Sequence, residues 1–169
     1  HVLGYVGPLT ESDLIAASGN RYYRSESIGK AGLEFQYDPF LRGKPGVRTV
    51  IVDRKESVMR QSQNTKSVPG DHVVTSLDVR LQAATENALA DAVARARVGG
   101  YRADSGAAIV MDVKTGRVLS IASYPTYDPN IWEKGLTVQQ AKDLFSDAKG
   151  VPALSRALQG QYAPASTFK

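Results

Sequence analysis

The sequence has no cysteine and only two histidines, His1 and His72, among its 169 residues. Without thiols the chain forms no disulfide and offers no thiolate to a metal ion, and two histidines far apart do not make an imidazole cluster. These absences argue against metal centres and thiol chemistry. We therefore expect no cofactor.

Long apolar runs are missing as well. No stretch approaches the ~20 apolar residues that cross a bilayer, and the first residues lack the charged and apolar regions of a signal peptide. The sequence also begins without methionine. We therefore expect it to be part of a longer polypeptide.

The charge balance is mildly basic, with a net charge of +4. The basic side chains are scattered and do not alternate with aromatic residues, so the pattern does not favour a nucleic-acid surface. A surface of this sign is compatible with anionic lipid headgroups or an anionic cell wall. The apolar content of 42% is ordinary for a chain that buries a core.

The first part of the chain, to about residue 70, reads as a series of short elements. Thr10 with Asp13 is typical of a helix N-cap, and glycine and proline after Leu41 end a second helical pattern. Alternating apolar runs around residues 53–57 predict a β-hairpin. The predicted elements are a helix from Thr10 to Ala17 ended by Ser18-Gly19-Asn20, a helix over 31–41, a hairpin of 47–52 with 58–61, and a polar connector over 61–70.

The second part, from about residue 71, contains one long helix. Asp78 is its predicted N-cap, and Gly99-Gly100 ends it after a basic last turn. The continuous apolar run 107–111 predicts a strand buried on both faces. The other predicted elements are a strand over 72–75, a hairpin over 107–123 that turns at Lys114-Thr115-Gly116, and a helix over 138–149 with Leu144 and Phe145 facing inward.

The residues Ser166-Thr167-Phe168-Lys169 place a serine and a lysine three positions apart, on one face of a helix. Ser-x-x-Lys is the acylation motif of enzymes that attack amides with a serine activated by a neighbouring amine. The spacing alone does not identify the site, because it occurs twice more, at Ser27 with Lys30 and at Ser146 with Lys149. We interpret both of these pairs as surface residues.

Taken in chain order, these motifs resemble a class B penicillin-binding protein, in particular the elongation-specific type. The string Ile28 to Glu34, followed by Leu41-Arg42-Gly43, resembles the signature of the irregular N-terminal region called the pedestal. Gly106 to Leu119 and the loop Tyr124 to Asn130 resemble the approach to the transpeptidase site, and Tyr162 to Lys169 then resembles the nucleophile motif. The resemblance covers almost the whole chain.

The residue before the predicted nucleophile is Ala165, where the class usually has glycine. The string Pro164 to Lys169 is therefore also similar to class D β-lactamases and their β-lactam sensor relatives. Those compact enzymes lack the pedestal strings. The resemblance thus favours the transpeptidase, with the β-lactamase or sensor as the alternative.

The resemblance implies an α+β fold with two parts. Residues 1–70 would form an irregular pedestal of short helices and hairpins, truncated at its N-terminus. Residues 71–169 would form the first, incomplete part of a serine β-lactamase-like α/β transpeptidase domain. It implies a D,D-transpeptidase that cross-links peptidoglycan stem peptides and is trapped by β-lactam antibiotics, with Ser166 as nucleophile and Lys169 as base. The remaining motifs of the family follow the nucleophile, so we expect this chain alone to be inactive.

The resemblance also implies partners and a location. The pedestal would contact a membrane glycosyltransferase and scaffold proteins, so an interaction module without catalysis is a second possible function of this chain. The parent protein would lie at the extracytoplasmic face of the bacterial plasma membrane, held by an N-terminal helix that this sequence does not include. No nucleic acid is expected as a partner.

Overall fold

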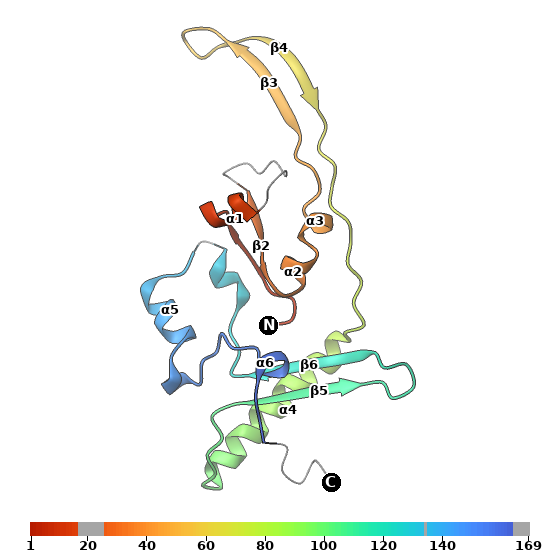
Figure 1. Cartoon of the computed structure of the whole chain (residues 1–169), viewed down its shortest axis with the longest axis vertical. Coiled ribbons are helices and arrows are strands. Elements are labelled where there is room, and N and C mark those ends of the chain that lie inside the picture. The colour runs from red at the N-terminus through yellow and green to blue at the C-terminus, as the bar shows by residue number, and fades with distance from the viewer. Residues whose placement is uncertain (17–25, 134, 164–169) are drawn as a thin grey trace.

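The computed structural model describes residues 1–16, 26–133 and 135–163 (Figure 1). They form an elongated α+β molecule, which confirms the predicted fold class, while the division at residue 70 stays a prediction. The elements in chain order are β1 (Tyr5–Pro8), α1 (Glu11–Ala16), β2 (Ser27–Ala31), α2 (Gly32–Gln36), α3 (Asp38–Leu41), β3 (Val47–Val52), β4 (Val58–Thr65), α4 (Val79–Val98), β5 (Gly106–Met111), β6 (Val118–Tyr124), η1 (Pro129–Trp132), α5 (Val138–Leu144), η2 (Asp147–Lys149) and α6 (Arg156–Gln159).

Helix α1 begins at the predicted cap. The Thr10 amide donates to Asp13 Oδ2 over 2.7 Å, and the Asp13 amide donates back to Thr10 Oγ1 over 3.4 Å. The ammonium of Lys30, in β2, also donates to the Asp13 carboxylate, and this bond, followed by the one from Thr10, lowers the pKa of Asp13 to about 2. The expected end at Ala17 and the terminator 18–20 lie outside the described residues.

The single helix predicted over 31–41 is wrong. Ala31 belongs to β2, and the helical residues divide at Tyr37 into α2 and α3. Pro39 has no N–H to donate to the carbonyl of Phe35, so the first helix cannot continue through it. Proline is tolerated in the first turn of a helix, which is the place it takes in α3.

Strands β3 and β4 form a hairpin that extends away from the rest of the molecule (Figure 1). The predicted hairpin is confirmed, but its second strand continues to Thr65, so most of the expected connector over 61–66 is strand. Residues 47–60 are exposed except for the half-buried Val50. Because neither face is covered there, polar residues can follow in the strand without the loss of any core contact.

Helix α4 matches its prediction at both ends. Asp78 Oδ1 accepts from the amides of Arg80 (2.8 Å) and Leu81 (3.0 Å), and the helix ends at Gly99. Gly100 follows with φ +79°, a left-handed conformation that glycine adopts without steric cost.

The strand predicted over 72–75 is not formed. The chain is hydrogen bonded to β6 only after this segment, where Ser76 Oγ donates to the Val118 carbonyl (2.7 Å) and the Asp78 amide donates to the Leu119 carbonyl (2.9 Å). Two isolated bonds do not make a ladder. His72, the first residue of the predicted strand, is therefore not in a sheet.

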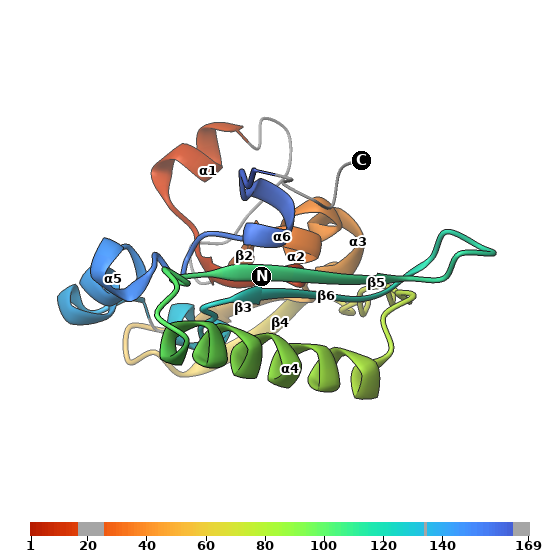
Figure 2. The ribbon, with the colours of Figure 1, turned by 90° about the horizontal axis from the view of Figure 1, so that it is seen from below.

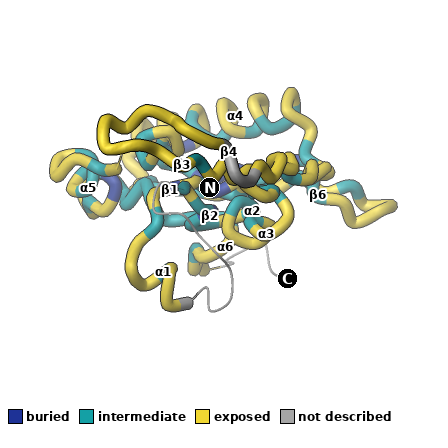
Figure 3. The backbone as a smooth tube through the Cα atoms, turned by 90° about the horizontal axis from the view of Figure 1, so that it is seen from above, coloured by how far each residue is buried: buried dark blue, intermediate teal, exposed yellow. Residues whose placement is uncertain are grey.

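Strands β5 and β6 form an antiparallel pair between α4 on one face and α6 on the other (Figure 2). The predicted hairpin is confirmed, but its burial is not. Strand β5 alternates between half-buried and exposed positions, with Ile109 50% exposed, whereas three of the seven residues of β6 are buried. The reason is that α4 lies mainly against β6 and covers β5 much less. Buried stretches are short throughout the described residues (Figure 3).

Helix α5 begins at a capping box of Thr137 and Gln140, but it ends at Leu144, short of the predicted residue 149. Leu144 is buried, as predicted. The inward position predicted for Phe145 is wrong, since its side chain is 59% exposed. Phe145 is the C-cap, where the backbone leaves the helical conformation, so its side chain no longer follows the buried face.

The β1–β2 pair is packed so closely against α2 that one of its glycines leaves no room for a side chain. A Cβ on Gly29 would lie 2.0 Å from the carbonyl oxygen of Glu34, whereas a Cβ on Gly7 would meet only the flexible side chain of Lys30, at 3.4 Å. The string Ile28 to Glu34 is therefore a packed structural junction.

This packing predicts different effects for two similar substitutions in the full-length protein. Gly29→Ala should lower the free energy of unfolding by about 1–3 kcal/mol, because overpacking forces the backbone to move. Gly7→Ala, on the neighbouring strand, should change it by less than about 0.5 kcal/mol. Urea unfolding of both variants tests this, and equal effects would contradict the packing described.

Candidate active site

The two residues predicted to carry the chemistry, Ser166 and Lys169, lie outside the described residues. The structure describes the chain up to residue 163. What it shows is how α6 and residues 160–163, which precede the predicted nucleophile, are held against the sheet.

Neither of the other two Ser-x-x-Lys pairs is arranged as a catalytic pair. Ser27 and Lys30 lie on strand β2, where residues three apart point to opposite faces. Lys30 is bonded to Asp13 instead. In the second pair, Lys149 Nζ lies 2.8 Å from the carboxylate of Asp143. Ser27 and Lys149 are exposed, as interpreted, whereas Lys30 and Ser146 are only partly exposed.

The sequence Lys114-Thr115-Gly116 forms the turn between β5 and β6, as predicted. Gly116 has φ +72°, and the Asp112 carboxylate accepts from Thr115 Oγ1 (2.7 Å) and from the Lys114 amide (2.9 Å). These two bonds, in that order, hold the pKa of Asp112 below its usual range. The carboxylate is thereby part of the turn.

Helix α6 is attached to the sheet by two hydroxyl contacts that the sequence did not indicate. The Ala157 amide, in the first turn of α6, donates to Ser123 Oγ in β6 over 3.0 Å. Beyond the helix, the Tyr162 hydroxyl is hydrogen bonded to Ser105 Oγ, just before β5, over 3.2 Å. The partners are 34 and 57 residues apart in sequence, so no local pattern could reveal them.

Arg156, the first residue of α6, is buried, with 9% of its surface exposed. Its guanidinium donates to three backbone carbonyls in the segment that leads into the helix, those of Gly150 (2.5 Å), Val151 (3.0 Å) and Leu154 (3.3 Å). A buried arginine bound only through carbonyls was also not predicted. It fixes the shape of the chain immediately before α6.

The aromatic residues of the loop Tyr124 to Asn130 and its surroundings pack on one another. Trp132 stacks on Tyr5 with ring centroids 4.1 Å apart, and Tyr127 meets Trp132 edge-on at 6.5 Å. Burial raises the pKa of Tyr127. These contacts join β1 to the loop after β6, so the rings serve packing.

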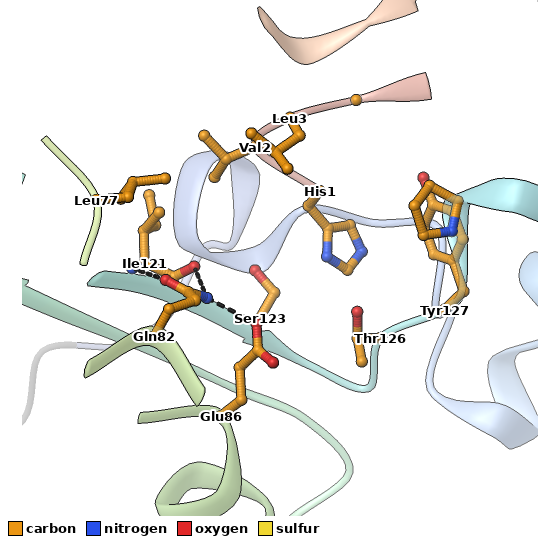
Figure 4. A pocket seen from close by; sticks show the side chains of 12 residues that line it. His1, Val2, Leu3, Leu77, Gln82, Glu86, Ile121, Ser123, Thr126 and Tyr127 are labelled. Atoms are coloured by element: carbon orange, nitrogen blue, oxygen red, sulfur yellow. Dashed lines mark hydrogen bonds between the residues drawn. The ribbon is translucent and has the colours of Figure 1, made fainter. Parts of the chain in front are cut away.

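A pocket of about 340 Å³ lies where the first residues of the chain meet α4 and β6 (Figure 4). His1, Leu3, Leu77 and Glu86 are among the residues that line it. Its serine, Ser123, accepts the bond from α6, and the lining holds no lysine. This pocket is a junction between the two parts of the chain and lacks the groups for serine acylation.

Gln82 forms the floor of this junction (Figure 4). Its Nε2 donates to the Ile121 carbonyl and its Oε1 accepts from the Ile121 amide, both over 2.9 Å. The side-chain amide thus bonds to the edge of β6 as a neighbouring strand would, and Ser120 Oγ donates to the same Oε1 over 3.2 Å.

Within residues 1–16, 26–133 and 135–163, no group of three or more His, Asp or Glu side chains is placed to hold a metal ion. None of the helices in that part of the chain has the length and apolar character needed to cross a membrane.

The comparisons with known proteins match both parts of the chain. Residues 1–75 match the family model of the penicillin-binding protein dimerisation domain, and residues 106–169 match that of the penicillin-binding protein transpeptidase domain. The peptidoglycan D,D-transpeptidase MrdA of Salmonella typhimurium is 36% identical over 173 aligned residues, which cover 100% of this chain and 26% of the relative.

Solved structures of similar proteins point to the same family. A chain from a peptidoglycan synthase complex is 38% identical with a TM-score of 0.70, over 92% of this chain and 27% of that one. In a complex of the penicillin-binding protein PBP2 and MreC from Helicobacter pylori, the matching chain is 31% identical with a TM-score of 0.66, over 92% of this chain and 26% of that one.

The chain therefore belongs to the penicillin-binding proteins, which confirms the resemblance found in the sequence. Its relatives include the peptidoglycan D,D-transpeptidases named MrdA. It spans about a quarter of the length of the curated relatives it matches.

The role of Gln82 can be separated from that of an ordinary helix glutamine. Gln82 and Gln139 each donate to a carboxylate four residues later, Glu86 (2.7 Å) and Asp143 (2.9 Å), but only Gln82 binds the sheet. In the full-length protein, Gln82→Leu should lower the free energy of unfolding by about 1–3 kcal/mol, because it leaves the Ile121 amide and carbonyl unpaired. Gln139→Leu should change the free energy of unfolding by less than about 0.5 kcal/mol. Urea unfolding compares them, and similar losses would disprove the strand-like role.

Proposed function

We propose that this chain is part of a peptidoglycan D,D-transpeptidase of the MrdA type, with residues 1–70 as pedestal and 71–169 as the first part of the transpeptidase domain. The observation that carries the proposal is the 36% identity with a protein of that name along the whole of this chain. The ordered motifs from Ile28 to Lys169 agree with it.

In the proposed reaction, Ser166 Oγ attacks the carbonyl carbon between the two terminal D-alanines of a stem peptide. The new C–O bond forms an ester, the C–N bond breaks, and the terminal D-alanine leaves with a proton on its amine. The amine of a second stem peptide then attacks the ester, which makes the cross-link and returns the hydroxyl to Ser166. A β-lactam acylates the same hydroxyl and leaves slowly.

Lys169 is the proposed base for the first step. A lysine on one helix face with the serine can reach its hydroxyl, but an unperturbed ammonium, with a pKa of ~10.4, is protonated at neutral pH. Burial and neighbouring cations lower a lysine pKa, so a closed site favours the neutral amine that the reaction needs. Lys30 and Lys149, the lysines of the other two pairs, are bonded to carboxylates.

The partners and location are proposed from the relatives. One solved relative belongs to a peptidoglycan synthase complex, and the Helicobacter pylori PBP2 is in complex with MreC. We place the corresponding contacts of this protein, with a membrane glycosyltransferase and a scaffold protein, on the pedestal. The protein would lie at the extracytoplasmic face of the bacterial plasma membrane, anchored by an N-terminal helix that precedes this sequence.

The nucleophile is tested by substitution in the full-length protein. Ser166→Ala should abolish covalent labelling by a fluorescent penicillin, because the attacking oxygen is removed. Ser27→Ala and Ser146→Ala are matched controls from the same spacing and should label fully. Stoichiometric labelling of Ser166→Ala, seen after gel electrophoresis, would rule out the assignment.

The base is tested by the rate of acylation. Lys169→Ala should slow acylation by about 10²- to 10⁴-fold, the usual value of general-base assistance, while the melting temperature changes little. Lys149→Ala, from the second Ser-x-x-Lys pair, should acylate at the wild-type rate. The base role would be refuted by an unchanged rate in a folded Lys169→Ala protein.

A further inference from the structure

The buried guanidinium of Arg156 has no function in the reaction proposed above. It donates to three backbone carbonyls, and no carboxylate lies within 4.0 Å of it among the described residues. An arginine is costly to bury, and it is retained where its fixed fork of donors organises several acceptors at once. The three carbonyls that accept these bonds identify the segment whose conformation the guanidinium stabilises.

The carbonyls belong to a segment with an unfavourable backbone. Gly150 and Val151 are consecutive residues with positive φ, +70° and +43°. Glycine accepts this conformation, but a β-branched residue such as valine does not adopt it without cost. Arg156 binds the carbonyls of both residues, and the Val151 amide donates to the Ser146 carbonyl over 2.8 Å. The surrounding bonds thus hold the chain in a shape that it would not keep alone.

Beyond Arg156 the chain is tied to one end of the β5–β6 hairpin. Ala107 pairs with Ser123 in the sheet, and Ser105 lies two residues before Ala107, so both hydroxyl contacts are at the same end. One holds the first turn of α6 at Ala157, and the other holds Tyr162. Arg156 and Ser123 hold the start of α6, and the contact between Ser105 and Tyr162 holds the chain after its end.

Tyr162 is four residues before the predicted nucleophile, a span of at most ~14 Å of extended chain. The direction in which the chain leaves α6 therefore limits where Ser166 can lie. We propose that Arg156, supported by Ser123, is a positioning residue that sets the place of Ser166 for acylation. This inference rests on the proposed function of Ser166. A displacement of about 1 Å can cost about 10²-fold in rate, so loss of the guanidinium should be visible in the kinetics.

The test uses the full-length protein with Arg156→Met, which keeps an unbranched side chain and loses the donors, and Arg156→Lys, which keeps the charge. Arg95→Met, at an exposed position of α4, is the matched control. Acylation by a fluorescent penicillin is followed to saturation. Three quantities are measured: the maximal rate, the half-saturating concentration and the final number of labels per folded molecule.

We expect Arg156→Met to reach full labelling with a maximal rate about 10- to 10²-fold lower and a similar half-saturating concentration. Arg156→Lys should recover part of the rate, and Arg95→Met should match the wild type. A wild-type rate with fewer labelled molecules would overturn the proposal, because it would show that Arg156 only keeps the protein folded.

If Arg156→Met does not fold, Arg156→Lys and Ser123→Ala decide the question. Slowed acylation at full labelling in both supports the proposal, and wild-type rates in both overturn it. Ser166→Ala, measured in parallel, separates the two claims. If Ser166→Ala is labelled, the proposed function has failed. If Ser166→Ala is not labelled and Arg156→Met is acylated at the wild-type rate, only the positioning role has failed.

Discussion

Strand β6 is the element on which the second part of the molecule depends. Gln82 binds both backbone groups of Ile121 at its outer edge, and Ser123 accepts from the first turn of α6 on one face. Strand β5 pairs with its other edge. Side-chain hydrogen bonds thus join two helices to one strand with defined geometry, which apolar packing alone would not give because it is not directional. Ser120, fully buried in the same strand, also bonds to Gln82.

The contrast among the Ser-x-x-Lys pairs shows that spacing is a weak criterion for a catalytic pair. On a strand the same spacing separates the two side chains, as at Ser27 and Lys30, and an acidic neighbour can bind the amine, as Asp143 binds Lys149. A lysine that acts as a base needs the opposite setting, without a carboxylate to stabilise its ammonium. The order of motifs along the chain carries the identification that spacing cannot.

The features that the sequence predicted are those set by neighbouring residues. Asp78 caps α4, Gly99 ends it, and Gly116 turns the β5–β6 hairpin. The errors arose where a local pattern admits two structures. A continuous helical pattern over 31–41 concealed the break at Pro39, and polar residues after position 60 concealed a strand. The contacts of the approach to the site, made by residues such as Ser123 and Arg156, were missed because bonds to partners distant in sequence, or to backbone carbonyls, leave no local pattern.

The central claim is that Ser166 is the nucleophile that becomes acylated. The most direct measurement of this claim is to locate the acyl group itself. The full-length protein is treated with benzylpenicillin and digested with trypsin, which releases residues 157–169 as one peptide because cleavage follows Arg156 and Lys169. Tandem mass spectrometry should find the penicilloyl group on that peptide, at Ser166. An adduct on any other peptide, or at another hydroxyl of this one, would contradict the account.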